Sequence, residues 1–103
     1  YAVRGFAILN DVTMFDAEMV NMHEVATVVS NGSKAAGTVL DDVCDEFKTI
    51  FNNADVIISK GQGNFESLHP INKENLFFLL MAKCSVIAKI FNVLPKSIIC
   101  MKN

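Results

Sequence analysis

The chain lacks a long apolar run, a basic leader and any close pair of cysteines. Its longest apolar run, 76–82, is far shorter than the roughly 20 apolar residues of a membrane-spanning helix, so we expect no membrane segment. No basic region followed by an apolar stretch opens the sequence, and we expect no signal peptide. Cys44, Cys84 and Cys100 are widely spaced and odd in number, which disfavours a disulfide framework or a zinc site and favours a reducing, cytoplasmic location.

Neither sign of charge dominates the sequence. Nine Lys and Arg residues and eleven Asp and Glu residues are scattered along the chain and give a net charge of -2. This balance excludes an electrostatic surface for nucleic acid. Apolar residues make up 51% and charged residues 19%, which is typical of a globular protein. The chain of 103 residues is therefore one domain or part of one, and its start at Tyr1 suggests a processed or truncated polypeptide.

Short β-prone segments alternate with segments of helical character. We expect strands at 3–9, 24–29, 55–59, 76–81 and 97–101, and helices over 13–22, from 38 to about 51, and over 85–91. Thr13 with Asp16, and Thr38 with Asp41, form patterns typical of a helix start. The strands are continuous and apolar, as when both faces of a sheet are covered. The sequence thus predicts an α/β fold with a doubly wound, mostly parallel, Rossmann-like sheet and helices on both faces.

Polar loops follow the first three predicted strands. They are 10–11, 31–38 and 60–64, and the carboxyl ends of parallel strands are where such sheets bind ligands. We therefore expect the three loops to converge on one edge of the sheet. Asp11 is a candidate ligand for a hard divalent cation, although an aspartate at this place equally suits a helix cap.

The glycines of two loops suit the binding of an anion. In 60–64, Lys60 adds a positive charge beside Gly61 and Gly63, whose backbone N–H groups can approach a phosphate. The loop at 30–38 precedes a predicted helix N-terminus, which also attracts anions. An ordinary tight turn and an ordinary capped loop explain the same residues. A dinucleotide site is disfavoured, because the strand at 76–81 runs into Ala82 and Lys83 and not into an acidic residue.

Three segments resemble the damage-control family of metal-dependent phosphatases, first catalogued as a domain of unknown function. They are 9–17 (Leu-Asn-Asp-Val-Thr-Met-Phe-Asp-Ala), 31–40 (Asn-Gly-Ser through Ala-Gly-Thr-Val-Leu) and the most distinctive, 59–68 (Ser-Lys-Gly-Gln-Gly-Asn-Phe-Glu-Ser-Leu). The segment 77–84 also matches. The resemblance covers about 3–99 and corresponds to the C-terminal half of the family domain. It implies that 1–103 is the C-terminal α/β part of a larger domain whose upstream part is absent.

The resemblance also implies roles for single residues. Asp11 would ligate the metal and Lys60 would meet the phosphoryl group, which makes these two the catalytic residues. Substrate contacts are implied for Asn10, Gly32, Ser33, Gly37, Thr38, Gly61, Gly63 and Asn64. Lys34 and Ala36 stand where the family has an aspartate and a proline, a departure that concerns substrate preference. The family's other metal ligands are an upstream Asp-Asn pair, and this dipeptide does not occur here, so we expect the chain alone to be inactive.

The expected function is metal-dependent hydrolysis of small phosphate monoesters, either sugar phosphates or damaged phosphometabolites. The resemblance implies manganese, cobalt, nickel or magnesium as the cofactor. The expected partners are a small-molecule phosphate ester and the missing N-terminal half of the domain, with no nucleic acid and no membrane. An open strand edge would also favour a homo-oligomer. Two alternatives remain: a carboxyl methyltransferase, and a non-catalytic anion-binding or interaction module of the same fold.

Overall fold

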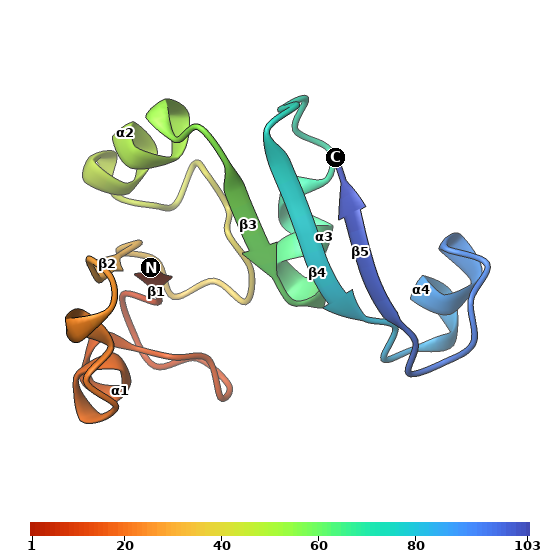
Figure 1. Cartoon of the computed structure of the whole chain (residues 1–103), viewed down its shortest axis with the longest axis horizontal. Helices are drawn as coiled ribbons and strands as arrows, with labels where there is room; N and C mark the ends of the chain where they lie inside the picture. Colours follow the sequence, from red (N-terminus) through yellow and green to blue (C-terminus); the bar gives the residue numbers. More distant parts are fainter. The chain divides into compact units, whose positions relative to one another are not determined.

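The computed structural model describes all of residues 1–103 and divides the chain into two compact units, 1–53 and 54–103. Each unit contains its own small sheet, with strands β1 and β2 in the first and β3, β4 and β5 in the second (Figure 1). Helices and strands alternate, and the α/β class predicted from the sequence is confirmed. No helix has both the length and the apolar character needed to cross a bilayer.

The first unit contains little regular structure. Its strands β1 (Ala2–Val3) and β2 (Val29–Ser30) pair in parallel over two residues each. Its helices are α1 (Met14–Met19), the 3-10 helix η1 (Met22–Glu24) and α2 (Asp45–Asn53). Because this sheet is short, side-chain hydrogen bonds hold much of the loop structure of this unit in place.

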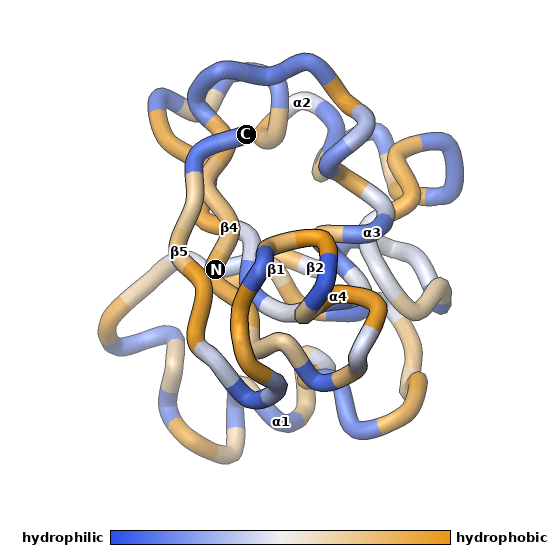
Figure 2. Tube along the Cα trace, turned by 90° about the vertical axis from the view of Figure 1, so that its right-hand side faces the viewer, coloured by the Kyte–Doolittle hydropathy of each residue, from blue (hydrophilic) through white to orange (hydrophobic).

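The second unit is built around one central strand. In chain order its elements are β3 (Ile57–Lys60), α3 (Gln62–Leu68), β4 (Leu76–Met81), α4 (Ser85–Ile90) and β5 (Ile98–Lys102). Strand β4 pairs in parallel with β3 and antiparallel with β5, so all three lie side by side in Figure 1. All residues of β4 are apolar, and Figure 2 shows the strand in the hydrophobic shades.

One face of this sheet forms a core with α3. Leu76, Phe78 and Leu80 are buried on that face, and the buried Phe65 and Leu68 of α3 cover them. The ring of Phe65 meets Phe78 edge-on, with the ring centroids 5.2 Å apart. Such aromatic contacts add to the burial of apolar area, so the amphipathic α3 is held mainly by packing.

The second unit leaves the other face of its sheet bare. Ile58 is 67% exposed and Leu79, in the central strand, is 38% exposed. With Val56, Phe77 and Cys100 these side chains line a shallow apolar depression. Burial along β4 alternates, because successive side chains point to opposite faces. Within the second unit, helix α3 covers one face of β3–β4–β5, and no helix of this unit covers the other.

Helix α1 begins where the sequence predicts. The backbone N–H and the hydroxyl of Thr13 donate to Oδ2 of Asp16 at 2.8 and 2.7 Å, and the amide of Ala17 closes the first helical turn on the carbonyl of Thr13. The Asp16 carboxylate thereby satisfies a donor that the helix start leaves without an internal partner.

Three predictions for the first unit were wrong. The segment 3–9 was expected to be a strand, but β1 ends at Val3. The segment 24–29 was expected to be a strand, but its beginning belongs to η1 and only Val29 joins β2. The helix expected from Thr38 begins instead at Asp45. A helix from Thr38 cannot run through Cys44, because the amide of Cys44 donates to the carbonyl of Asn31 at 2.9 Å and not to the carbonyl four residues earlier.

Acid should weaken α1 through Asp16. Hydrogen bonds from the hydroxyl and then the amide of Thr13 hold the pKa of the Asp16 carboxyl below its usual 3.8. Because the folded-state pKa is depressed, the contact stabilises the fold above the usual pKa and is lost as pH falls through the lower, folded-state value. The urea midpoint of the parent should therefore fall as the pH drops below ~4. Asp16→Asn should reduce this fall. Asp41→Asn, a change at an exposed position, should not. Equal acid sensitivity in both variants would contradict this.

Charge on the bare sheet face should reduce self-association of the 103-residue chain. An exposed apolar surface of this kind promotes contacts between copies, and a lysine at its centre makes burial costly. Leu79→Lys should lower the mass seen by light scattering toward that of the monomer. The control is Val86→Lys, a change at a 63% exposed position of α4, which should leave association as in the parent. A parent that is monomeric at all concentrations would refute the prediction.

Candidate functional site

The loop after β1 presents Asn10 and Asp11 on a tight turn. The amide of Asp11 donates to the carbonyl of Ile8 at 3.1 Å, and Leu9 takes a positive φ of 51° to close the turn. Asn10 is exposed, and the Asp11 side chain is 40% exposed. Both predicted site residues are therefore accessible to a ligand from solvent.

Arg4 holds this turn against the second polar loop. Its Nε lies 2.9 Å from Oδ2 of Asp11, and its guanidinium also donates to the backbone carbonyl of Gly37. The Arg4 side chain is only 9% exposed. Arg4 was missed as a site residue from the sequence, although a charged residue inside the apolar segment 3–9 indicates that it needs a buried partner.

The second polar loop is fixed from within. Oδ1 of the buried Asn31 accepts hydrogen bonds from the amides of Gly5 and Ser33, at 3.1 and 3.0 Å. The Ser33 hydroxyl donates to the Asp42 carboxylate and accepts from the amide of Ala35. Ser33 is 1% exposed, so in this conformation its hydroxyl supports the loop and does not face solvent.

Glycine is required where the two loops touch. A Cβ at Gly5 would lie 2.5 Å from the carbonyl carbon of Gly32, far inside contact distance. Gly32 itself has a φ of 73°, and Gly37 a φ of 137°, conformations that other residues rarely adopt. Of the predicted contact residues here, Gly32 is exposed, whereas Gly37 and Thr38 are buried.

The second loop does not lead into a helix N-terminus, contrary to the sequence-based expectation. Helix α2 begins at Asp45, and its first turn carries the carboxylates of Asp45 and Glu46. Negative side chains already complement the positive end of the helix dipole there. The loop therefore has no helix start with which to attract a phosphate, and its role depends on its glycines and its contact with Arg4.

In the second unit, Lys60 is the last residue of β3, and helix α3 begins at Gln62. The predicted loop at 60–64 is thus a direct change from strand to helix through Gly61, with a φ of 99°. A Cβ at Gly61 would meet open space, so the backbone conformation alone calls for glycine. The side chain of Lys60 is exposed at the carboxyl end of its strand.

The N–H groups at this junction are partly occupied. The amide of Gly61 donates to the carbonyl of Leu79 at 2.8 Å. This N–H is therefore used within the sheet and does not face a ligand. Gly63 lies in the first turn of α3, where amides have no partner within the helix. The side chain of Asn64 donates to the carbonyl of Lys60 at 2.8 Å and so braces the strand end.

Two buried polar atoms on either side of Lys60 and Gly61 have no hydrogen-bond partner in the chain. They are Oγ of Ser59 and Oε1 of Gln62, whose Nε2 donates to Glu66 at 2.8 Å. Buried polar atoms are nearly always satisfied, and exceptions concentrate at functional positions. This observation marks the junction of β3 and α3 as chemically distinct from the rest of the unit.

The donors near Asp11 suit a hard divalent cation in kind but not in number. Carboxylate and amide oxygens are the ligands that such cations prefer. The Asp11 carboxylate is 40% exposed despite its ion pair with Arg4, and Asn10 is its neighbour. No group of three or more His, Cys, Asp or Glu residues is arranged to hold a metal ion. Asn10 and Asp11 are therefore too few donors to complete a metal site on their own.

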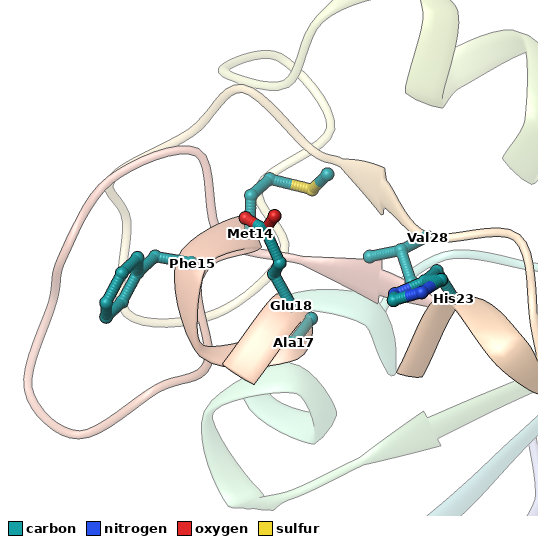
Figure 3. Close-up of a pocket in the computed structure, with 6 residues that line it drawn as sticks. All are labelled: Met14, Phe15, Ala17, Glu18, His23 and Val28. Atoms are coloured by element: carbon teal, nitrogen blue, oxygen red, sulfur yellow. The ribbon is translucent and has the colours of Figure 1, made fainter. Parts of the chain in front are cut away.

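A separate apolar depression lies along α1 and η1 in the first unit. Figure 3 shows Met14 and Glu18 from α1 and His23 beside Val28, with Phe15 turned away from them. Glu18 and His23 are its only ionisable residues, and neither Asn10 nor Asp11 lines it. This depression is therefore not the predicted phosphate site.

Two proteins with similar sequences are named damage-control phosphatases. The chain is 44% identical over 96 residues to a damage-control phosphatase of Pyrococcus horikoshii, covering 93% of the chain and 33% of that protein. It is 35% identical over 88 residues to a damage-control phosphatase of Archaeoglobus fulgidus, covering 84% of the chain and 31% of that protein. The chain thus spans about a third of the length of these relatives.

The structure and a family model agree with these relatives. A crystal structure of a DUF89 family protein from Pyrococcus horikoshii matches with a TM-score of 0.92 and 42% identity, over 99% of the chain and 36% of that protein. The model of the damage-control phosphatase ARMT1-like domain matches residues 1–98. The segments proposed to resemble the family all lie within this match. The chain therefore belongs to the family of damage-control phosphatase ARMT1-like domains.

Proposed function

We propose that the protein containing this chain is a metal-dependent phosphatase that hydrolyses small phosphate monoesters, either sugar phosphates or damaged phosphometabolites. Family membership supports phosphatase chemistry of the damage-control type. The observation that carries the proposal is the position of Lys60, exposed at the carboxyl end of β3 beside a glycine with a positive φ. Ligands of open α/β sheets bind at such strand ends.

Lys60 would act on the phosphoryl group. Its ammonium group would neutralise negative charge on the phosphoryl oxygens as the bond to the leaving group breaks. The N–H of Gly63 in the first turn of α3 would add a neutral donor, and Gly61 and Asn64 would hold the strand end in place. The unpartnered Ser59 and Gln62 atoms support a polar ligand at this junction.

Asp11, with Asn10 beside it, would hold one side of a divalent cation. Manganese, cobalt, nickel or magnesium would supply Lewis-acid polarisation of the phosphate ester. Arg4, Gly37 and the loop around Gly32, Ser33 and Thr38 would keep Asp11 in place and border the substrate. That Asp11 and Lys60 act in the same reaction is part of this proposal, and it rests on the family resemblance.

The isolated 103-residue chain should have little activity, because Asp11 alone leaves a cation mostly hydrated. A phosphatase assay of this chain with added Mn²⁺ tests that expectation, and full activity would contradict it.

We also propose a cytoplasmic location, supported by three free cysteines, which cell fractionation would test. No contact in the structure favours the methyltransferase or the non-catalytic alternative.

Replacing Lys60 should lower turnover more than stability. In the full-length protein, Lys60→Ala should reduce kcat by about 10²–10³-fold, as losing one donor to transition-state charge typically does. Because Lys60 is exposed, the melting temperature should change little. Release of phosphate from a panel of sugar phosphates with Mn²⁺ measures the effect.

Lys89→Ala is the matched control, since Lys89 is an exposed lysine on α4. It should retain the activity of the parent. Turnover of Lys60→Ala within a few-fold of the parent would refute the role of Lys60. A parent that binds phosphate without hydrolysing any ester would favour the non-catalytic module.

A further inference from the structure

The ion pair between Arg4 and Asp11 is buried on one side only. The Arg4 side chain is 9% exposed, whereas the Asp11 side chain is 40% exposed. A guanidinium withdrawn from water is costly unless charged and polar partners surround it. Arg4 has such partners in the Asp11 carboxylate and the Gly37 carbonyl. The arginine is therefore fixed in the protein, and the aspartate is the member of the pair that still meets solvent.

The contact uses one oxygen of the carboxylate. Nε of Arg4 donates to Oδ2 of Asp11 at 2.9 Å, and the carboxylate is 40% exposed. The backbone joins the same segments, since the amide of Arg4 donates to the carbonyl of Val12 at 2.9 Å. A carboxylate held in this way on a fixed group has a defined orientation and remains open to a ligand.

We propose that Arg4 is a positioning residue that orients the Asp11 carboxylate toward the divalent cation. Its bond to Gly37 ties that orientation to the second polar loop. The inference rests on the proposed function, because it needs Asp11 to be a metal ligand. Groups that orient a metal ligand in this way typically contribute 10–100-fold to metal affinity.

Charge and positioning predict opposite effects for the loss of Arg4. Arg4 carries a positive charge close to the cation site, so its removal would tighten cation binding if Coulomb repulsion alone mattered. Loss of the orienting contact weakens binding instead. The direction of the change therefore separates a positioning residue from a neighbouring charge.

The test is Mn²⁺ binding to the full-length protein, measured by the EPR signal of free Mn²⁺. Arg4→Gln should bind Mn²⁺ about 10–100-fold more weakly than the parent. The control is Lys48→Gln, which removes one positive charge from an exposed pair with Asp45 in the same unit and should leave affinity unchanged. Asp11→Asn provides the reference for loss of the ligand itself.

A second variant and a second readout guard against misfolding. Arg4→Lys keeps the charge but cannot reach Asp11 and Gly37 together through a planar fork, so it should also weaken Mn²⁺ binding. Without metal, the Nε–H resonance of Arg4 in a ¹⁵N NMR spectrum should be sharp in the parent and shift in Asp11→Asn. This signal reports the contact independently of activity and of the metal.

The outcomes are separable. Unchanged or tighter Mn²⁺ binding in a folded Arg4→Gln or Arg4→Lys, with binding lost in Asp11→Asn, overturns the role of Arg4 and leaves the proposed function standing. If Asp11→Asn binds Mn²⁺ as tightly as the parent does, the assignment of Asp11 as a metal ligand is wrong. The proposed role of Arg4 is then wrong as well.

Discussion

The buried guanidinium of Arg4 is the constraint on which the first unit depends. Two strands of two residues each contribute few backbone hydrogen bonds, so the loops around them need other restraints. Arg4 joins the turn at Asp11 to the carbonyl of Gly37, and Asn31 joins the two loops a second time through the amides of Gly5 and Ser33. Unsatisfied buried polar groups are costly, so each of these contacts restricts the loops to one arrangement.

The second unit depends on apolar packing. Phe78 in the central strand is fully buried, and Phe65 and Leu68 of α3 cover it and its neighbours. This difference between the units explains what the sequence predicts well. The strand 76–81 matches β4 residue for residue, because a continuous apolar run is a local signal of a buried strand. The start of α1 at Thr13 is equally local, since its partner Asp16 is three residues away.

Elements that depend on distant partners could not be predicted in this way. The segment after Thr38 has helical periodicity, but the amide of Cys44 bonds to the carbonyl of Asn31, and helix α2 begins only at Asp45. Helix α3 contains a glycine and follows Gly61, which suggests a turn, and it forms because Phe65 and Leu68 are buried on the sheet. Tertiary packing overrides local propensity in both places.

The same distinction applies to the candidate site. Asp11 and Lys60 stand out because they follow apolar strands and lie in segments that resemble the family. Arg4 does not stand out, because its partners are 7 and 33 residues away along the chain. The fold of the first unit brings Arg4, Asp11 and Gly37 together, and so it turns a loop aspartate into an oriented carboxylate.

The central claim is that Asp11 ligates a divalent cation while Arg4 holds its other oxygen. Anomalous scattering from crystals of the full-length protein soaked in Mn²⁺ tests this most directly. The account predicts an anomalous peak beside Oδ1 of Asp11, with Nε of Arg4 still on Oδ2. A peak elsewhere with none near Asp11, or an Asp11 that leaves Arg4 to reach the metal, would contradict it.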